Sequence, residues 1–123
     1  MNARKTLETL FMAAVDAVRG DRAVARALDA WEDPPPDRIV AVGKAATAMA
    51  QAAHKVFPEV PLLIVTKYDH AEDAPAGAEV IESAHPVPDQ NSIQAGTRLL
   101  ETVCGMGHGS HLLMLVSGGA SSL

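Results

Sequence analysis

Aromatic residues are scarce in this chain, since Phe, Trp and Tyr together make up 3% of its 123 residues. Proteins that recognise bases by stacking need several aromatic side chains, so we do not expect that kind of recognition here. Basic residues are also few, because 10 Lys and Arg stand against 15 Asp and Glu, giving a formal charge of −5. With no basic stripe we expect no nucleic-acid partner, although backbone N–H groups can still build a local anion site.

Cysteine occurs once, at Cys104, so the chain forms no internal disulfide and a reducing, cytoplasmic setting is expected. A signal peptide is not expected, because Glu8 and Asp16 interrupt the apolar stretch near the N-terminus. No window of the sequence approaches the ~18 consecutive apolar residues that a membrane span requires. The sequence therefore predicts a soluble protein without a membrane partner, and it does not specify an oligomeric state.

What the chain does contain is typical of a globular domain, with 48% hydrophobic and 20% charged residues. Two amphipathic helices are predicted at the N-terminus from apolar residues at helical spacing. We expect Gly20 to stop the first helix and Asp21 to cap the second. Three prolines at 34–36 end this helical part. We therefore divide the chain into a helical segment, 1–36, and an α/β part, 37–123. The two helices are expected to pack on the α/β part or on another domain.

The α/β part alternates short apolar runs with helical patterns. Strands are predicted near 39–42, 62–65, 78–84 and 111–116, and helices between 44 and 57 and from 91 to 103. This order predicts a three-layer, Rossmann-like α/β domain with a largely parallel sheet. No covering helix follows the last strand, so we expect the domain to be incomplete at its C-terminus and to expose apolar surface there.

Ligands of such sheets bind at the carboxyl ends of the strands, which directs attention to the residues that follow each one. The first strand leads into Gly43-Lys44. Gly43 permits a sharp turn, and Lys44 falls at a helix start, where free N–H groups and an ammonium together suit a phosphate or carboxylate. A solvated surface lysine is the alternative. The stretch is neither a Walker A loop nor a dinucleotide fingerprint.

The third strand leads into His85-Pro86-Val87-Pro88-Asp89. Two prolines within four positions make a stiff loop whose shape is set in advance. His85 could orient a substrate or transfer a proton, and Asp89 could cap the next helix. The alternative is that both are only turn and cap residues.

The fourth strand leads into a stretch of glycine and serine, and its candidate ligand-binding residues are Ser117, Gly118, Gly119 and Ser121. This pattern is typical of an anion-binding nest, and the absence of G-x-S-x-G argues against a serine hydrolase. A flexible tail is the alternative. His108 and His111 have no neighbouring cysteine or carboxylate cluster, so no metal site is predicted.

Three stretches, VAVGKAATAMA, ESAHPVPDQNSIQAG and LLMLVSGGASSL, together resemble the N-terminal part of the class II glycerate 2-kinases. These form the MOFRL family, whose members are often labelled hydroxypyruvate reductase. The resemblance covers nearly the whole chain. It implies ATP-dependent phosphorylation of D-glycerate to 2-phosphoglycerate with Mg²⁺, in a cleft between two α/β domains of a much longer protein.

The resemblance assigns Lys44 to the active site, against substrate or phosphoryl oxygens, and Ser117, Gly118 and Gly119 to the start of a glycine-rich loop. That loop commonly reads SGGGSAL, whereas here Ala120 replaces the third glycine and Ser122 the alanine, which could restrict the loop. Residues for Mg²⁺ and transition-state charge are implied to lie downstream, so the isolated chain is expected to be inactive. Two alternatives remain: an NAD(P)H-dependent hydroxypyruvate reductase, and a non-catalytic module that binds a small metabolite.

Overall fold

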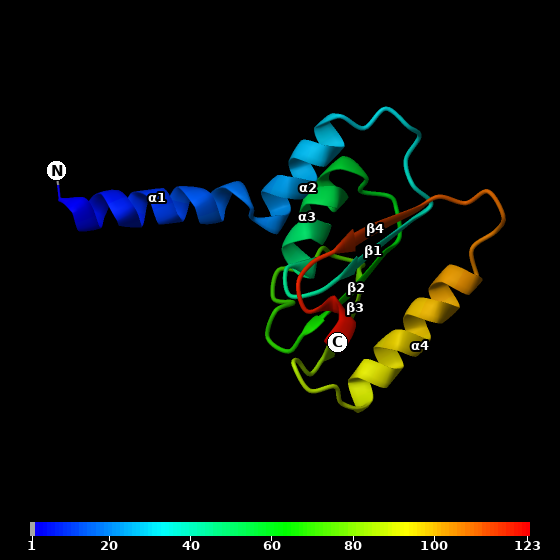
Figure 1. Ribbon diagram of the computed structural model, residues 1–123. Helices are drawn as coiled ribbons and strands as arrows, with labels where there is room; N and C mark the ends of the chain where they lie inside the picture. The colour runs from blue at the N-terminus through cyan, green and yellow to red at the C-terminus, as the bar shows by residue number, and fades with distance from the viewer. Residues whose placement is uncertain (1) are drawn as a thin grey trace.

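The computed structural model describes residues 2–123 and shows an α/β architecture (Figure 1). In chain order the elements are α1 (Ala3–Ala17), α2 (Gly20–Asp29), β1 (Arg38–Val42), α3 (Ala46–Val56), β2 (Leu62–Lys67), β3 (Glu79–Ser83), α4 (Gln90–Cys104), β4 (Leu112–Val116) and a 3₁₀ turn (Ala120–Ser122). Every strand and helix expected in the α/β part is present.

The four strands form one parallel sheet in the order β3-β2-β1-β4. Helices α2 and α3 cover one face of this sheet, and α4 covers the other (Figure 1). The predicted three-layer α/β domain with a parallel sheet is therefore confirmed. Because all four strands run in the same direction, their carboxyl ends lie along one edge of the sheet.

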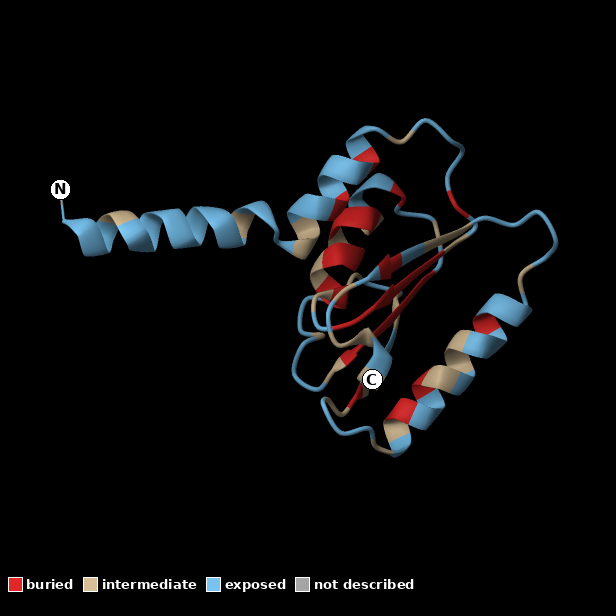
Figure 2. Cartoon of the chain, viewed as in Figure 1, coloured by how far each residue is buried: buried red, intermediate tan, exposed pale blue. Residues whose placement is uncertain are grey.

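The core lies on both faces of the two central strands, β1 and β2 (Figure 2). Alternate residues of β1 point to opposite faces: Ile39 packs in the cluster beneath α3, and Val40 packs in the cluster beneath α4. Small residues of α3, such as Ala46, Ala50 and Ala53, are fully buried and allow this helix to lie close to the sheet. A strand buried on both faces explains why β1 and β2 show no polar alternation in the sequence.

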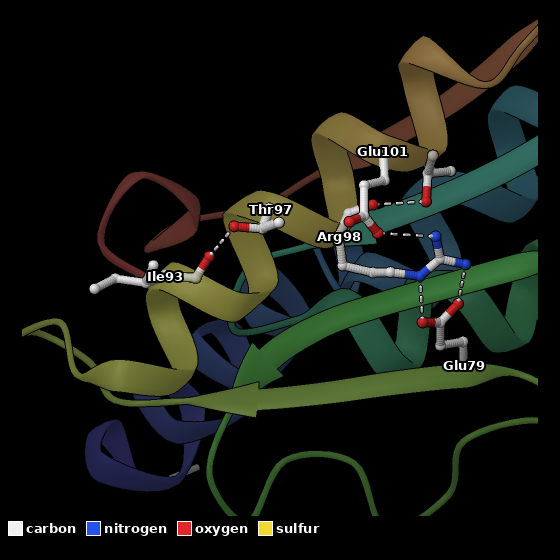
Figure 3. A network of polar contacts seen from close by, with 6 residues as sticks. Glu79, Ile93, Thr97, Arg98 and Glu101 are labelled. Atoms are coloured by element: carbon white, nitrogen blue, oxygen red, sulfur yellow. Dashed lines mark hydrogen bonds and ion pairs between the residues drawn. The ribbon is translucent and has the colours of Figure 1, made fainter.

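Helix α4 is fastened to the edge strand β3 by an ion pair (Figure 3). The guanidinium of Arg98 donates from Nε and Nη2 to the two carboxylate oxygens of Glu79, at 2.6 and 2.9 Å. This hydrogen bonding lowers the pKa of Glu79 below its ordinary value. Both side chains are more than one-third exposed, so the pair contributes only modestly to stability.

The two N-terminal helices differ in how they relate to the sheet. Helix α2 belongs to the core, because Val24 and Leu28 are buried in the cluster beneath α3. Helix α1 extends away from the body (Figure 1), and none of its residues is buried. Leu10 and Phe11 on its apolar stripe are 61% and 66% exposed. The division into segments 1–36 and 37–123 stays a prediction, although α2 shares its core with the second segment.

The start of α2 corrects two local expectations. Gly20 is not a stop, because it is the first residue of α2, and a Cβ there would lie 2.8 Å from Cγ of Met49. Asp21 is not the cap, because Arg19 occupies the N-cap position and makes no side-chain capping bond. Asp21 lies in the first turn and accepts a hydrogen bond from Nη2 of Arg19 at 3.1 Å. The position of the N-terminal end of α2 is therefore decided by its close contact with α3.

Strand β4 forms one edge of the sheet, and Met114 and Val116 on it are 50% and 61% exposed. Among residues 2–123, no helix combines the length and the apolar character needed to cross a bilayer.

Candidate functional site

The turns after β1 and β4 lie side by side and are joined by hydrogen bonds. The N–H of Lys44 donates to the carbonyl of Gly118 at 3.0 Å, and the N–H of Ala45 donates to Oγ of Ser117 at 3.0 Å. Ser117 in turn donates its N–H to the carbonyl of Val42 at 2.9 Å. The first N–H groups of this turn are therefore engaged within the chain, contrary to the expectation that they are free for an anion. The charge of Lys44, whose side chain is exposed, remains available.

Gly43 allows these two turns to approach each other. Its φ is +123°, a region that side chains rarely adopt. A Cβ at this position would lie 2.2 Å from Oγ of Ser117 and 2.7 Å from the carbonyl oxygen of the same residue. Glycine is therefore required at 43, both for its backbone conformation and for the contact with Ser117.

Gly119 is the point where all three predicted stretches meet. A Cβ added to Gly119 would lie 2.8 Å from Nε2 of His85 and 3.1 Å from Cε of Lys44. Its φ is +86°, which also favours glycine. The loops after β1, β3 and β4 thus converge on one small volume, which is bounded by an ammonium-bearing side chain, an imidazole and a glycine backbone.

The glycine turn retains unpaired donors next to Lys44. Within residues 2–123, the N–H groups of Gly118 and Gly119 have no hydrogen-bond acceptor. Two neighbouring free N–H groups beside an ammonium are the pattern of a backbone anion site. Oxygen atoms of a phosphate or a carboxylate fit this arrangement.

The rest of the glycine-serine stretch forms a short 3₁₀ turn, Ala120–Ser122, in which Ser121 is exposed. Ala120 packs against the cluster beneath α4. A 3₁₀ backbone is open to any L-residue, so the Cβ of Ala120 is accommodated and the left-handed conformation falls on Gly119 instead.

Asp89 is engaged within the chain by both of its carboxylate oxygens. It is the N-cap of α4 in a capping box with Ser92, as the sequence predicted for the cap. Oδ1 accepts hydrogen bonds from the N–H groups of Ser92 at 3.2 Å and Ala84 at 3.3 Å, and Oδ2 accepts one from the hydroxyl of Tyr68 at 2.6 Å. The Tyr68 hydrogen bond is the main reason that the pKa of Asp89 is lowered. A direct role of Asp89 in ligand binding stays a prediction.

A second feature borders Lys44 on the side of α3. A cavity of about 270 Å³ lies between α3 and the loop after β2, and its lining includes Lys44, Thr47, Gln51, Asp69, His70 and Asp73. The loop is held to α3, because Thr47 Oγ1 donates to the carbonyl of His70 at 2.6 Å and the Gln51 amide donates to the carbonyl of Asp73. Only the fold brings this loop next to Lys44.

Metal ligands were not predicted, and the described residues contain no group of three or more His, Cys, Asp or Glu side chains placed to hold an ion.

Comparison with known proteins assigns this chain to a family. Residues 6–123 match the family described as "Domain of unknown function (DUF4147)". A putative hydroxypyruvate reductase of Agrobacterium vitis is 41% identical over the whole chain, which covers 28% of that relative. A D-glycerate 2-kinase of Thermotoga maritima is 42% identical over 89% of the chain and 26% of the relative.

Two solved structures show the same fold. The crystal structure of glycerate kinase from Thermotoga maritima superposes with a TM-score of 0.84 at 38% identity, over 97% of this chain and 30% of that one. A protein of Pyrococcus horikoshii OT3 superposes with a TM-score of 0.80 at 29% identity, over 100% of this chain and 30% of that one. The chain spans less than one-third of the length of these relatives. It belongs to the DUF4147 family and has the fold of the corresponding part of glycerate kinase.

Proposed function

We propose that these residues form one wall of the active site of a glycerate 2-kinase, which transfers a phosphoryl group from ATP to the 2-hydroxyl of D-glycerate. The observation that carries this proposal is the convergence of Lys44, His85 and Gly119 at the carboxyl edge of the sheet. Relatives and a solved structure named as glycerate kinases support it. Because the chain covers only part of them, the activity is proposed for the natural protein that contains these residues.

Each residue of the wall has a proposed task. The ammonium of Lys44 neutralises charge on substrate or phosphoryl oxygens, which is the main requirement of phosphoryl transfer. The free N–H groups of Gly118 and Gly119 orient one anionic group beside it. His85 contacts the substrate from the loop after β3, while Gly43 and Ser117 shape the turn. Ser121 and Asp89 stay in the proposed binding set, with Asp89 acting on the loop that carries His85.

ATP supplies the phosphoryl group, and the hydrogen-bond donors of this site, the N–H groups of Gly118 and Gly119 and the ammonium of Lys44, fit its oxygen atoms or the carboxylate of D-glycerate. Mg²⁺ fits less well, because the residues that converge on Gly119 offer N–H groups, an ammonium and an imidazole rather than carboxylates. We therefore assign no Mg²⁺ ligand to residues 2–123, and we propose that other residues of the natural protein supply those ligands. The exposed single thiol, Cys104, accords with the cytoplasmic setting that we propose.

The proposal is tested by mixing the natural full-length protein with ATP, Mg²⁺ and D-glycerate and following 2-phosphoglycerate by ³¹P NMR. We expect product from the full-length protein and none from the 123-residue chain alone. Hydroxypyruvate with NAD(P)H is tested in parallel, since relatives also carry the reductase name. Oxidation of the nucleotide without kinase product would favour the reductase. Binding of D-glycerate without either reaction would favour a non-catalytic module.

A further inference from the structure

Tyr68, which follows β2 directly, connects this strand to the loop that carries His85. Its N–H donates to the carbonyl of Ser83 at 3.2 Å, and its hydroxyl donates to Oδ2 of Asp89 at 2.6 Å. The same hydroxyl accepts a hydrogen bond from Nδ2 of Asn91 at 2.9 Å. With a donor and an acceptor both engaged, the phenol ring is held in one orientation although 42% of the residue is exposed.

Asp89 passes this restraint to both ends of the loop. It closes the loop at its exit, where α4 begins, and its Oδ1 accepts from the N–H of Ala84 at the entrance, at 3.3 Å. Between these ends, Pro86 and Pro88 have no N–H to donate. The position of the loop therefore depends on the groups that hold its ends.

The contact with Tyr68 goes beyond what the helix cap requires. Capping of α4 uses Oδ1 of Asp89 and the side chain of Ser92. The hydrogen bond from Tyr68 uses the other oxygen, Oδ2, and comes from the turn that follows β2. It therefore fixes the Asp89 carboxylate relative to the sheet, and not only relative to its own helix.

The restraint on this loop determines the position of the His85 side chain. Its Nε2 lies 2.8 Å from the point where a Cβ of Gly119 would stand, and Cε of Lys44 lies 3.1 Å from the same point. A small shift of the loop after β3 would open or close this contact directly. A misplacement of such groups by about 1 Å can lower the rate roughly 100-fold.

We propose that Tyr68 is a positioning residue, which holds the Asp89 carboxylate and thereby keeps His85 at its position next to Gly119 and Lys44. This inference rests on the proposed kinase function of the site. Tyr68 does not touch the substrate in this proposal; it acts through Asp89 and the loop.

The test compares Tyr68→Phe with Asp89→Asn and the double variant, all in the full-length natural protein. Tyr68→Phe removes only the hydroxyl, and Asp89→Asn keeps a good N-cap while removing the carboxylate. We expect Tyr68→Phe to lower kcat/KM for D-glycerate roughly 10- to 100-fold, as for a misplaced reacting group. The double variant should lose little more than either single variant, because one connection is removed in each case.

Ring ¹H–¹⁵N resonances of His85 give a second readout, which does not depend on activity. They should shift in Tyr68→Phe and in Asp89→Asn, and remain in place in the control Arg98→Gln, which removes a polar contact between α4 and β3 away from the loop. If Tyr68→Phe does not fold, Asp89→Asn carries the same comparison. Unchanged His85 resonances in the variants, or an equal shift in Arg98→Gln, would overturn the inference. Absence of 2-phosphoglycerate with the wild-type protein would instead refute the proposed function, while the NMR comparison would still decide the role of Tyr68.

Discussion

Replacement of Gly43 by alanine should destabilise the domain more than any replacement that only changes backbone freedom. The φ of +123° at Gly43 costs a side chain at least about 1–2 kcal/mol, by analogy with the left-handed helix region. The new Cβ would also stand 2.2 Å from Oγ of Ser117 and 2.7 Å from its carbonyl oxygen. Overpacking of this kind typically costs about 1–3 kcal/mol. Together the two effects give about 2–5 kcal/mol, against a total stability of about 5–15 kcal/mol for a natural domain.

Gly77→Ala is the matched control, because Gly77 has a φ of +82° but nothing within 4 Å of its added Cβ. It should lose only the backbone part, about 1–2 kcal/mol. Urea unfolding of the 123-residue chain, followed by the fluorescence of its single tryptophan, Trp31, measures both losses. The double variant Gly43→Ala with Ser117→Ala should recover only part of the loss, because the carbonyl clash remains. Equal losses in Gly43→Ala and Gly77→Ala would refute the argument that the two turns are in direct contact.

Three further outcomes are expected. Lys44→Met should reduce phosphorylation of D-glycerate by the full-length protein by roughly 100-fold or more, as for other groups that stabilise developing charge, whereas Lys55→Met, at the exposed end of α3, should leave kcat within about twofold. Ser117→Ala should cost about 1 kcal/mol in urea unfolding, because an amide N–H at the start of α3 loses its acceptor; no measurable loss would contradict that role. The lowered pKa values of Glu79 and Asp89 contribute stability that is present above the ordinary carboxyl range and is lost as pH falls through their folded values, so melting temperature should drop below about pH 4. A melting temperature that stays constant from pH 7 to pH 3 would count against both interactions.

Much of the fold could be predicted from the sequence, because the signals are local. The uninterrupted apolar runs of β1 and β2 predicted strands. These strands are buried on both faces, because Ile39 packs on one side of the sheet and Val40 packs on the other. The cap at Asp89 was also visible, since a capping side chain acts on N–H groups within three residues. The start of α2 was misplaced, because the position of Gly20 is decided by its contact with Met49 of another helix.

For the candidate site, the sequence by itself determined the residue types and the strand ends at which they fall. It identified Gly43, Lys44, His85 and Gly119 separately, as features of three loops. Only the tertiary structure decided that they meet, because the strand order β3-β2-β1-β4 brings β4 beside β1 and joins turns that are 72 residues apart in the chain. Tyr68 could not be found from the sequence for the same reason: its partner Asp89 lies 21 residues away. Side-chain periodicity acts over a few residues, whereas the pairing of parallel strands is a property of the whole sheet.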